Sequence, residues 1–163
     1  AHISYAANSD EVAVSATLDQ LHQAASEADG AKYLSLFTDN AVYFGLSALQ
    51  RWPIEQFRSY AQERFGSGTG WTYTKLSRNV TLSPDGNTAW FDERLNNANY
   101  GIALGTGAMV KQNGQWKIAQ YNLTLQIPVD MLPKIAKDIM ARDAKTHEEL
   151  PIKNNPSPQK ETK

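Results

Sequence analysis

The sequence predicts an α+β domain in which helices cover one face of a strongly curved, mainly antiparallel sheet. Two observations predict this fold class. Helical periodicity dominates residues 10–65, whereas four long strand patterns joined by short turns fill residues 71–127. A further helical pattern closes the domain. Helices first and sheet later is an α+β layout, and 163 residues suit one domain with a substantial core.

The N-terminal region predicts a flexible arm followed by a helix. Residues 1–9 carry no periodicity, and Asp10 and Glu11 place acids where a helix has its positive end. Gly30 is predicted to stop this helix. Its apolar stripe follows the spacing i, i+4, i+7 and i+11: Val14, Leu18, Leu21 and Ala25.

Two more helices and one short strand are predicted before the main sheet. The short helix covers residues 31–37 and ends before residues 38–40, and the strand covers residues 41–45. The third helix covers residues 51–65, with Pro53 in its first turn, where a missing N–H costs nothing. Tyr60 lies beside its apolar face, which consists of Ile54, Phe57, Ala61 and Phe65.

The four strand patterns indicate an antiparallel meander. They cover residues 71–82, 88–97, 102–112 and 115–127, and the last two are joined by Asn-Gly, the strongest two-residue hairpin signal. A closing helix over residues 130–145 has one apolar face: Leu132, Ile135, Ala136, Ile139 and Met140. The domain is expected to span residues 10–142, and residues 143–163, rich in Pro and Lys towards their end, to form a largely disordered tail.

Composition excludes several classes of function. A net charge of −1 and the lack of a basic stripe give no pull towards nucleic acid, and no apolar run reaches the roughly 18 residues of a membrane span. The absence of cysteine removes disulfides, thiolate catalysis and Cys-based zinc sites. A cytoplasmic location is expected, and because the chain begins Ala-His-Ile instead of Met, a periplasmic or secreted protein from which a signal peptide was removed is the alternative.

Three segments resemble one known family. Residues 18–45, residues 51–65 and the segment GQWKIAQYNLTLQIP at residues 114–128 resemble the SnoaL-like branch of the nuclear-transport-factor-two-like superfamily. The resemblance covers roughly residues 10–128. It implies a cone-shaped fold, a pocket between the helices and the concave sheet, and a homodimer formed through the outer sheet face.

The last strand pattern carries large apolar residues in both of its alternating sets, so neither face reads as plain solvent surface. The dimer implied by the resemblance offers an explanation. One set is then expected to face the helices: Ala119, Tyr121, Leu123 and Leu125. The other is expected to be buried against a second copy: Trp116, Ile118, Gln120, Asn122 and Thr124. Many relatives carry His at the position of Asn122, and Asn cannot titrate, so a general-base role there is lost.

The resemblance leaves activity open, because the superfamily includes isomerases, cyclases, dehydratases and pockets that only bind. The catalytic Tyr and Asp of the steroid isomerases align with Leu21 and Gly45. Neither of these can donate or abstract a proton. Steroid isomerisation is therefore not expected.

Asp92 is the candidate catalytic residue. Trp90, Asp92 and Arg94 share one face of a strand, and Phe91, Glu93 and Leu95 share the other. A carboxyl group buried near aromatic rings has a raised pKa, which suits a general acid or base. The alternative is a structural salt bridge to an arginine. Glu93 is expected to be an interface or structural acid.

The candidate ligand-binding residues are mainly aromatic, and plain core packing is the alternative for each. They are Trp52, Phe57, Tyr60, Trp90, Asp92 and Tyr121. Gly101, Gly105 and Gly107 share one strand face, where they either leave room for a ligand or permit curvature. His2, His22 and His147 show no metal-ligand spacing, so neither metal nor cofactor is predicted.

Three functions follow from these patterns. The first is a small-molecule-binding protein whose ligand is apolar or of mixed polarity. The second is an isomerase, cyclase or dehydratase that uses Asp92 as general acid or base. The third is a dimeric assembly domain without a ligand. A homodimer is expected in each, and neither nucleic acid nor membrane is an expected partner.

Overall fold

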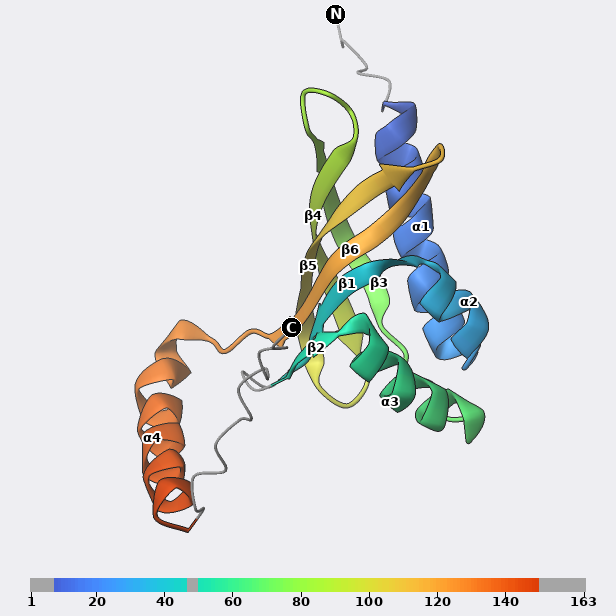
Figure 1. The fold of residues 1–163 in the computed structure, drawn as a ribbon. Coiled ribbons are helices and arrows are strands. Elements are labelled where there is room, and N and C mark those ends of the chain that lie inside the picture. Colours follow the sequence, from blue (N-terminus) through green and yellow to red (C-terminus); the bar gives the residue numbers. More distant parts are fainter. Residues whose placement is uncertain (1–7, 47–49, 150–163) are drawn as a thin grey trace, which may run out of the picture. The chain divides into compact units, whose positions relative to one another are not determined.

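The structure, a computed structural model, describes residues 8–46 and 50–149 and divides into two units. The first ends at Gln126 and the second begins at Ile127. The first unit holds three helices and six strands (Figure 1): α1 (Ser9–Ser26), α2 (Gly30–Ser35), β1 (Phe37–Phe44), β2 (Arg51–Pro53), α3 (Ile54–Gly66), β3 (Thr74–Leu82), β4 (Thr88–Asn97), β5 (Gly101–Gln112) and β6 (Gln115–Leu125).

The strands form one sheet in the order β2-β1-β6-β5-β4-β3. Strand β1 runs parallel to β6, and every other neighbouring pair is antiparallel. Asn113 and Gly114 connect β5 to β6 with φ values of 52° and 75°, which fits the hairpin turn that the Asn-Gly pair predicts. The α+β class and the antiparallel meander are therefore confirmed.

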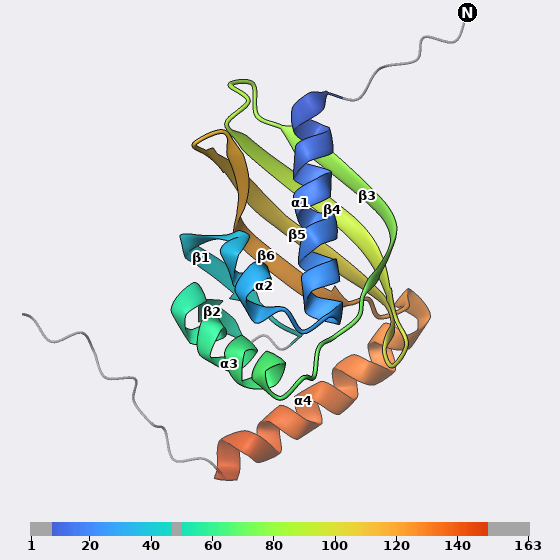
Figure 2. The ribbon, with the colours of Figure 1, turned by 90° about the vertical axis from the view of Figure 1, so that its right-hand side faces the viewer.

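Helix α1 packs against one face of this sheet, as Figure 2 shows. The whole predicted stripe is buried, Val14, Leu18, Leu21 and Ala25, and Ala24 is buried beside it. The side chain of Asn8 accepts a hydrogen bond from the backbone N–H of Asp10 at 2.9 Å and caps the helix. Burying each leucine or valine contributes about 1.5–3 kcal/mol, so the stripe holds α1 on the sheet.

Helix α3 buries the face that its spacing predicts. Ile54, Phe57, Ala61 and Phe65 are all buried. Pro53 occupies the N-cap position, one residue before the first turn of the helix. The helix packs against β1 and β2, which places its aromatic residues beside the end of the sheet.

Two predicted boundaries between α1 and β1 are wrong. Helix α1 ends at Ser26, and Gly30 is the first residue of α2. The chain turns through Ala28, whose φ is 55°, and the Asp29 side chain then accepts a hydrogen bond from Lys32 N at 2.9 Å. This cap starts a new helix at Gly30. Residues 38–40 belong to β1 and do not form a loop.

A β-bulge in β6 explains why both alternating sets of that strand contain large apolar residues. Ile118 pairs with Met109 and Gln120 pairs with Ala108, so Ala119 is an extra residue. The alternation of faces therefore shifts at Ala119. Trp116 and Ile118 before the bulge are buried in the core, as are the two apolar residues after it, Tyr121 and Leu123.

The bulge corrects the expected composition of the outer sheet face. Trp116 and Ile118 were expected to face a second copy, but they lie in the core of their own chain. Gln120 is exposed, and Asn122 and Thr124 are partly exposed. Only these three members of the predicted set stay on the outer face.

The second unit contains a short 3-10 helix, Val129–Met131, and α4, Leu132–Glu149. Helix α4 continues past both the predicted end of the helix at residue 145 and the predicted end of the domain at residue 142. The predicted arm covers residues 1–9 and the predicted tail residues 143–163, but Ser9 begins α1 and residues 143–149 belong to α4. The rest of both segments, residues 1–7 and 150–163, lies outside the described residues, so disorder there stays a prediction. None of the helices in the described part of the chain combines the length and apolar character needed to cross a bilayer.

Candidate functional site

Aromatic side chains from several elements of the first unit converge on one small hollow, called here the aromatic pocket. Its volume is about 200 Å³. Seven of the twelve lining residues are aromatic. The lining comprises Tyr43, Gly45, Leu46, Gln50, Trp52, Phe57, Tyr60, Arg64, Trp71, Tyr73, Tyr100 and Leu123.

Stacked rings build the wall of this pocket. The rings of Tyr43 and Phe57 lie 3.9 Å apart at 11°, and those of Trp52 and Phe57 lie 5.7 Å apart at 29°. Tyr60 follows Trp52 at 5.2 Å. Such contacts stabilise aromatic pairs beyond the burial of their area. The wall is therefore held in place before any ligand arrives.

Two hydroxyl groups of the pocket, those of Tyr43 and Tyr73, have raised pKa values and are neutral hydrogen-bonding groups. Burial raises the pKa of Tyr43 well above its ordinary value. Burial, and next the neighbouring Tyr100, raise the pKa of Tyr73. A protonated phenol donates one hydrogen bond and accepts others. The pocket can thus orient a polar substituent of a bound molecule without supplying negative charge.

Arg64 is the one charged side chain that lines the aromatic pocket among the described residues. It lies in the last turn of α3. Its guanidinium carbon is 5.8 Å from the centre of the Trp71 ring, within the range of a cation–π contact. The rim of the pocket therefore carries positive charge.

A second polar cluster lies deeper, around Glu93 on β4. This carboxylate is fully buried, with 0% exposure. Its Oε1 accepts hydrogen bonds from His22 Nε2 at 2.7 Å and from the Tyr121 hydroxyl at 2.8 Å. Its Oε2 accepts from Arg78 Nε at 2.8 Å. Arg78 Nη2 lies 2.7 Å from the same Oε2, without hydrogen-bond geometry.

These partners keep Glu93 ionised. Burial alone would raise the pKa of its carboxyl, but the hydrogen bond and charge of His22, then the charge of Arg78, outweigh burial and lower the pKa. Arg78 is held in turn by Ser15 and Asp19 on α1. Both oxygens of Glu93 are occupied, which leaves little capacity to take a proton from a substrate.

Gly105 makes room for this cluster. A Cβ at this position would lie 2.6 Å from the Tyr121 hydroxyl and 2.9 Å from Glu93 Cγ. The equivalent atom at Gly107 would lie 2.1 Å from the carbonyl oxygen of Gln120 and 2.8 Å from Phe91. Protein atoms fill both spaces. These two glycines therefore serve internal packing, and neither leaves room for a ligand.

The structure brings together half of the predicted ligand-binding residues. Trp52, Phe57 and Tyr60 line the aromatic pocket. Tyr121 stands behind it: its ring stacks on Tyr43 at 5.8 Å, and its hydroxyl points away to Glu93. Tyr121 therefore connects the aromatic wall to the buried acid.

Trp90 and Asp92 lie on the other face of the sheet. Strand β4 alternates strictly, and it buries Phe91, Glu93 and Leu95. Trp90 and Asp92 are consequently exposed, and Asp92 Oδ2 accepts a hydrogen bond from Asn79 Nδ2 at 2.9 Å. The expectation that Asp92 is an acid inside an aromatic chamber is corrected here: the acid that points inward is Glu93.

The sequence patterns do not point to most of the other lining residues, among them Arg64, Trp71, Tyr73 and Tyr100. Trp71 and Tyr73 were read as part of a strand, but β3 begins at Thr74. Tyr100 lies in the turn between β4 and β5. The one local signal that could have found them is the pair of aromatic residues Trp71 and Tyr73 close to the end of α3.

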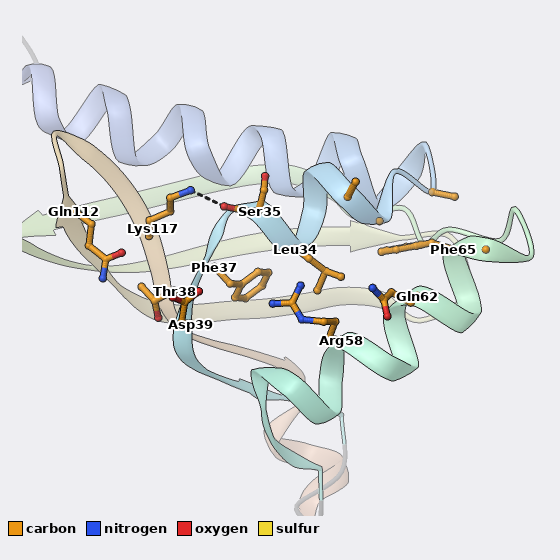
Figure 3. A pocket seen from close by; sticks show the side chains of 14 residues that line it. Leu34, Ser35, Phe37, Thr38, Asp39, Arg58, Gln62, Phe65, Gln112 and Lys117 are labelled. Atoms are coloured by element: carbon orange, nitrogen blue, oxygen red, sulfur yellow. Dashed lines mark hydrogen bonds between the residues drawn. The ribbon is translucent and has the colours of Figure 1, made fainter.

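A second hollow lies between α2, α3 and the β5–β6 hairpin and measures about 630 Å³ (Figure 3). Lys117 Nζ donates a hydrogen bond to the Ser35 carbonyl at 2.6 Å, and Arg58 reaches in from α3. Asp39 on β1 lines the same hollow. Its charges are mixed, so it selects a ligand less clearly than the aromatic pocket does.

No group of three or more His, Asp or Glu side chains suited to a metal ion occurs in the part of the chain that the structure describes. His22 is committed to Glu93. His2 lies outside the described residues.

Comparison with known families decides the family. The model of the SnoaL-like domain matches residues 14–128, which is most of the first unit. The chain belongs to the SnoaL-like domain family. The match ends just beyond β6, so it includes the aromatic pocket and the Glu93 cluster of this SnoaL-like protein.

Solved structures share the fold of this SnoaL-like protein at low identity. A protein proposed to be a dehydratase of the NTF2-like family from Streptomyces avermitilis has a TM-score of 0.63 and 11% identity, with 73% of this chain and 97% of that chain covered. An NTF2-like protein of unknown function from Pseudomonas putida has a TM-score of 0.61 and 15% identity, with 74% and 89% covered. These likenesses establish the fold alone.

A third similar structure covers a larger share of this chain. A domain of unknown function with a cystatin-like fold from Nostoc punctiforme has a TM-score of 0.62 and 12% identity, with 89% of this chain and 100% of that chain covered. No curated protein matches the sequence.

Proposed function

We propose that this SnoaL-like protein binds a small, mainly apolar molecule in the aromatic pocket. One observation carries the proposal: seven aromatic side chains from separate segments surround a single hollow. Pockets that bind small molecules are lined by apolar and aromatic groups, with a few polar groups that orient the ligand. Here the polar groups include the tyrosine hydroxyls, Gln50 and Arg64.

The volume of the pocket suits about one ring. A cavity of about 150 Å³ accommodates benzene, and the aromatic pocket measures about 200 Å³. Pockets for drug-sized ligands measure roughly 300–1,000 Å³. A substituted benzene or cyclohexane therefore fits this space, whereas a steroid or polyketide would extend beyond it.

Binding is favoured over acid–base catalysis because, among the described residues, no carboxylate lines the aromatic pocket. Asp92 lies on the opposite face of the sheet and bonds Asn79. Glu93 is buried and its oxygens are occupied by His22, Tyr121 and Arg78. A general base needs a lone pair within reach of the proton it abstracts.

We also infer that the outer sheet face joins two copies of the chain. Trp90 is 50% exposed there and Ile102 is 40% exposed, and β5 pairs directly with β4. Large apolar side chains exposed on a sheet face favour association, and a two-fold contact pairs that face with itself. This proposal applies equally to a ligand-binding protein and to an assembly domain.

NMR of the tryptophan indole N–H groups tests the proposed ligand site. The chain has four tryptophans: Trp52 and Trp71 line the pocket, Trp90 lies outside and Trp116 lies in the core. Benzyl alcohol serves as the neutral one-ring probe, and single Trp→Phe variants assign the four signals. We expect the Trp52 and Trp71 signals to shift with one saturable affinity. No shift at millimolar probe, or equal shifts of all four signals, contradicts the proposed function.

A further inference from the structure

We infer that the ligand of the aromatic pocket carries an anionic group, such as a carboxylate, and that Arg64 binds it. This inference rests on the proposed function and specifies its ligand class. It starts from the charges around the pocket: Arg64 lines it, and no acidic side chain in residues 8–46 and 50–149 does. A purely apolar ligand would leave this arginine without a role in recognition.

The position of Arg64 suits an anion bound at the rim. The cation–π contact with Trp71 holds the guanidinium against the wall of the pocket. None of the ion pairs in residues 8–46 and 50–149 includes Arg64. A guanidinium offers its N–H donors in a planar fork that matches the two oxygens of a carboxylate.

A second observation comes from the adjoining hollow of about 480 Å³. It shares Arg64, Trp71, Tyr73 and Tyr100 with the aromatic pocket, so these residues separate an apolar chamber from an outer groove. The rest of that groove consists of small neutral residues, mostly with amide or hydroxyl side chains, and among its described lining no acid occurs. A ring inside the chamber and an anionic group in the groove would both find matching surroundings.

The turn that carries Tyr100 is fixed by a buried asparagine. Asn97 Nδ2 donates to the Thr72 carbonyl at 2.9 Å, and its Oδ1 accepts from the backbone N–H groups of Asn99 and Tyr100 at 2.9 and 3.1 Å. Tyr100 is thereby held at the boundary between the two hollows, although it is 58% exposed. The outer wall of the site is therefore in place without ligand.

A structural role for Arg64 is the competing explanation. The residue lies in the last turn of α3, where a positive charge interacts favourably with the helix dipole. That role predicts a small loss of stability on substitution, with no dependence on the charge of a ligand. The charge of the probe therefore separates the two explanations.

The experiment compares benzoate with benzyl alcohol, which have similar rings and differ in charge. Both are titrated into the wild-type chain, Arg64→Gln, Arg64→Lys and the control Arg51→Gln, with the indole shifts of Trp52 as the readout. Arg51 is also an exposed arginine over an aromatic ring, at 5.7 Å from that of Phe44, but it does not line the pocket.

We expect benzoate to bind the wild type about fivefold more tightly than benzyl alcohol, the size of an exposed charge pair. Arg64→Gln should abolish this preference, Arg64→Lys should retain part of it, and Arg51→Gln should leave it unchanged. Added salt should weaken the binding of benzoate and leave the binding of benzyl alcohol unchanged. Equal binding of the two probes, or a preference that survives Arg64→Gln, overturns the inference while the proposed function stands. If neither probe binds the wild type, both fail.

Discussion

At the scale of single residues, the position of two acids decides what the molecule can do. Asp92 and Glu93 are neighbours in sequence, but strand alternation sends them to opposite faces of the sheet. Glu93 is surrounded by His22, Tyr121 and Arg78, each from another element. The buried acid therefore joins α1, β3, β4 and β6, and its role is structural.

Glu93→Gln should lower the free energy of unfolding by about 3 kcal/mol near neutral pH, because it leaves Arg78 without its buried partner. A lowered carboxyl pKa contributes stability above the unfolded-state value of about 4.3, and that contribution is lost as pH falls through the lower folded-state value. Denaturant titrations should thus show wild type and variant far apart at pH 7 and converging below pH 4. A constant gap across this range would contradict the assignment.

Gly105→Ala should be destabilising by about 1–3 kcal/mol, because its Cβ would overlap the Tyr121 hydroxyl and Glu93. Gly66→Ala is the matched control, since nothing lies within 4 Å of a Cβ there. Thermal unfolding of the two variants compares them directly. Similar melting temperatures for both would show that the space beside Gly105 is not as tightly filled as the structure has it.

At the scale of elements, the bulge at Ala119 decides which side of β6 belongs to the core. Met109 pairs with Ile118 and Ala108 with Gln120, so the strand gains one residue and its alternation shifts. Trp116, which precedes the bulge, faces the core and contacts α1, where its Nε1 donates a hydrogen bond to Asp10 Oδ1 at 3.0 Å. One extra residue thus lets both ends of β6 contribute to the core.

Ile118→Asp should prevent folding, because it places an unpaired charge at a fully buried position. Gln120→Asp, on the exposed face two residues further on, should change the free energy of unfolding by no more than about 0.5 kcal/mol. Circular dichroism and denaturant titration of both variants check this. A folded, monomeric Ile118→Asp would instead support the interface role first expected for this face.

The elements that sequence predicts well are those whose signals are local. The α1 stripe through Val14 and Leu18 and the turn at Asn113–Gly114 depend on neighbours within a few residues, so periodicity and turn chemistry reveal them. The bulge at Ala119 has no such signal, since it depends on the register with β5. Prediction of the faces of β6 therefore fails halfway along the strand.

At the scale of the whole molecule, the first unit encloses a core that is rich in stacked rings. Tyr33, Phe37 and Phe57 pack together, and the stack continues through Tyr43 to Tyr121. Tyr43 and Phe57 belong both to this core and to the lining of the aromatic pocket. The candidate site could be predicted only in part, because Trp71 and Tyr100 meet α3 through tertiary packing alone.

Trp90→Glu should convert the proposed dimer to a monomer, because it places like charges opposite each other in a two-fold contact. Tyr60→Glu, an exposed aromatic residue of similar accessibility at 44%, is the matched control away from this face. Light scattering at micromolar concentration gives the mass of each species. A monomeric wild type, or a dimer that tolerates Trp90→Glu, would show that the outer sheet face is not a dimer interface around Trp90.

The central claim, that the aromatic pocket binds a one-ring molecule, is tested most directly by comparing Trp52→Ala with Trp90→Ala. Both changes remove an indole, and the first lies in the wall of the pocket whereas the second lies on the outer sheet face. We expect Trp52→Ala to weaken binding of benzyl alcohol about tenfold, as the loss of a stacked aromatic contact of about 1–1.5 kcal/mol requires, and Trp90→Ala to leave it unchanged. Equal affinities in the two variants, or a loss confined to Trp90→Ala, would contradict the claim.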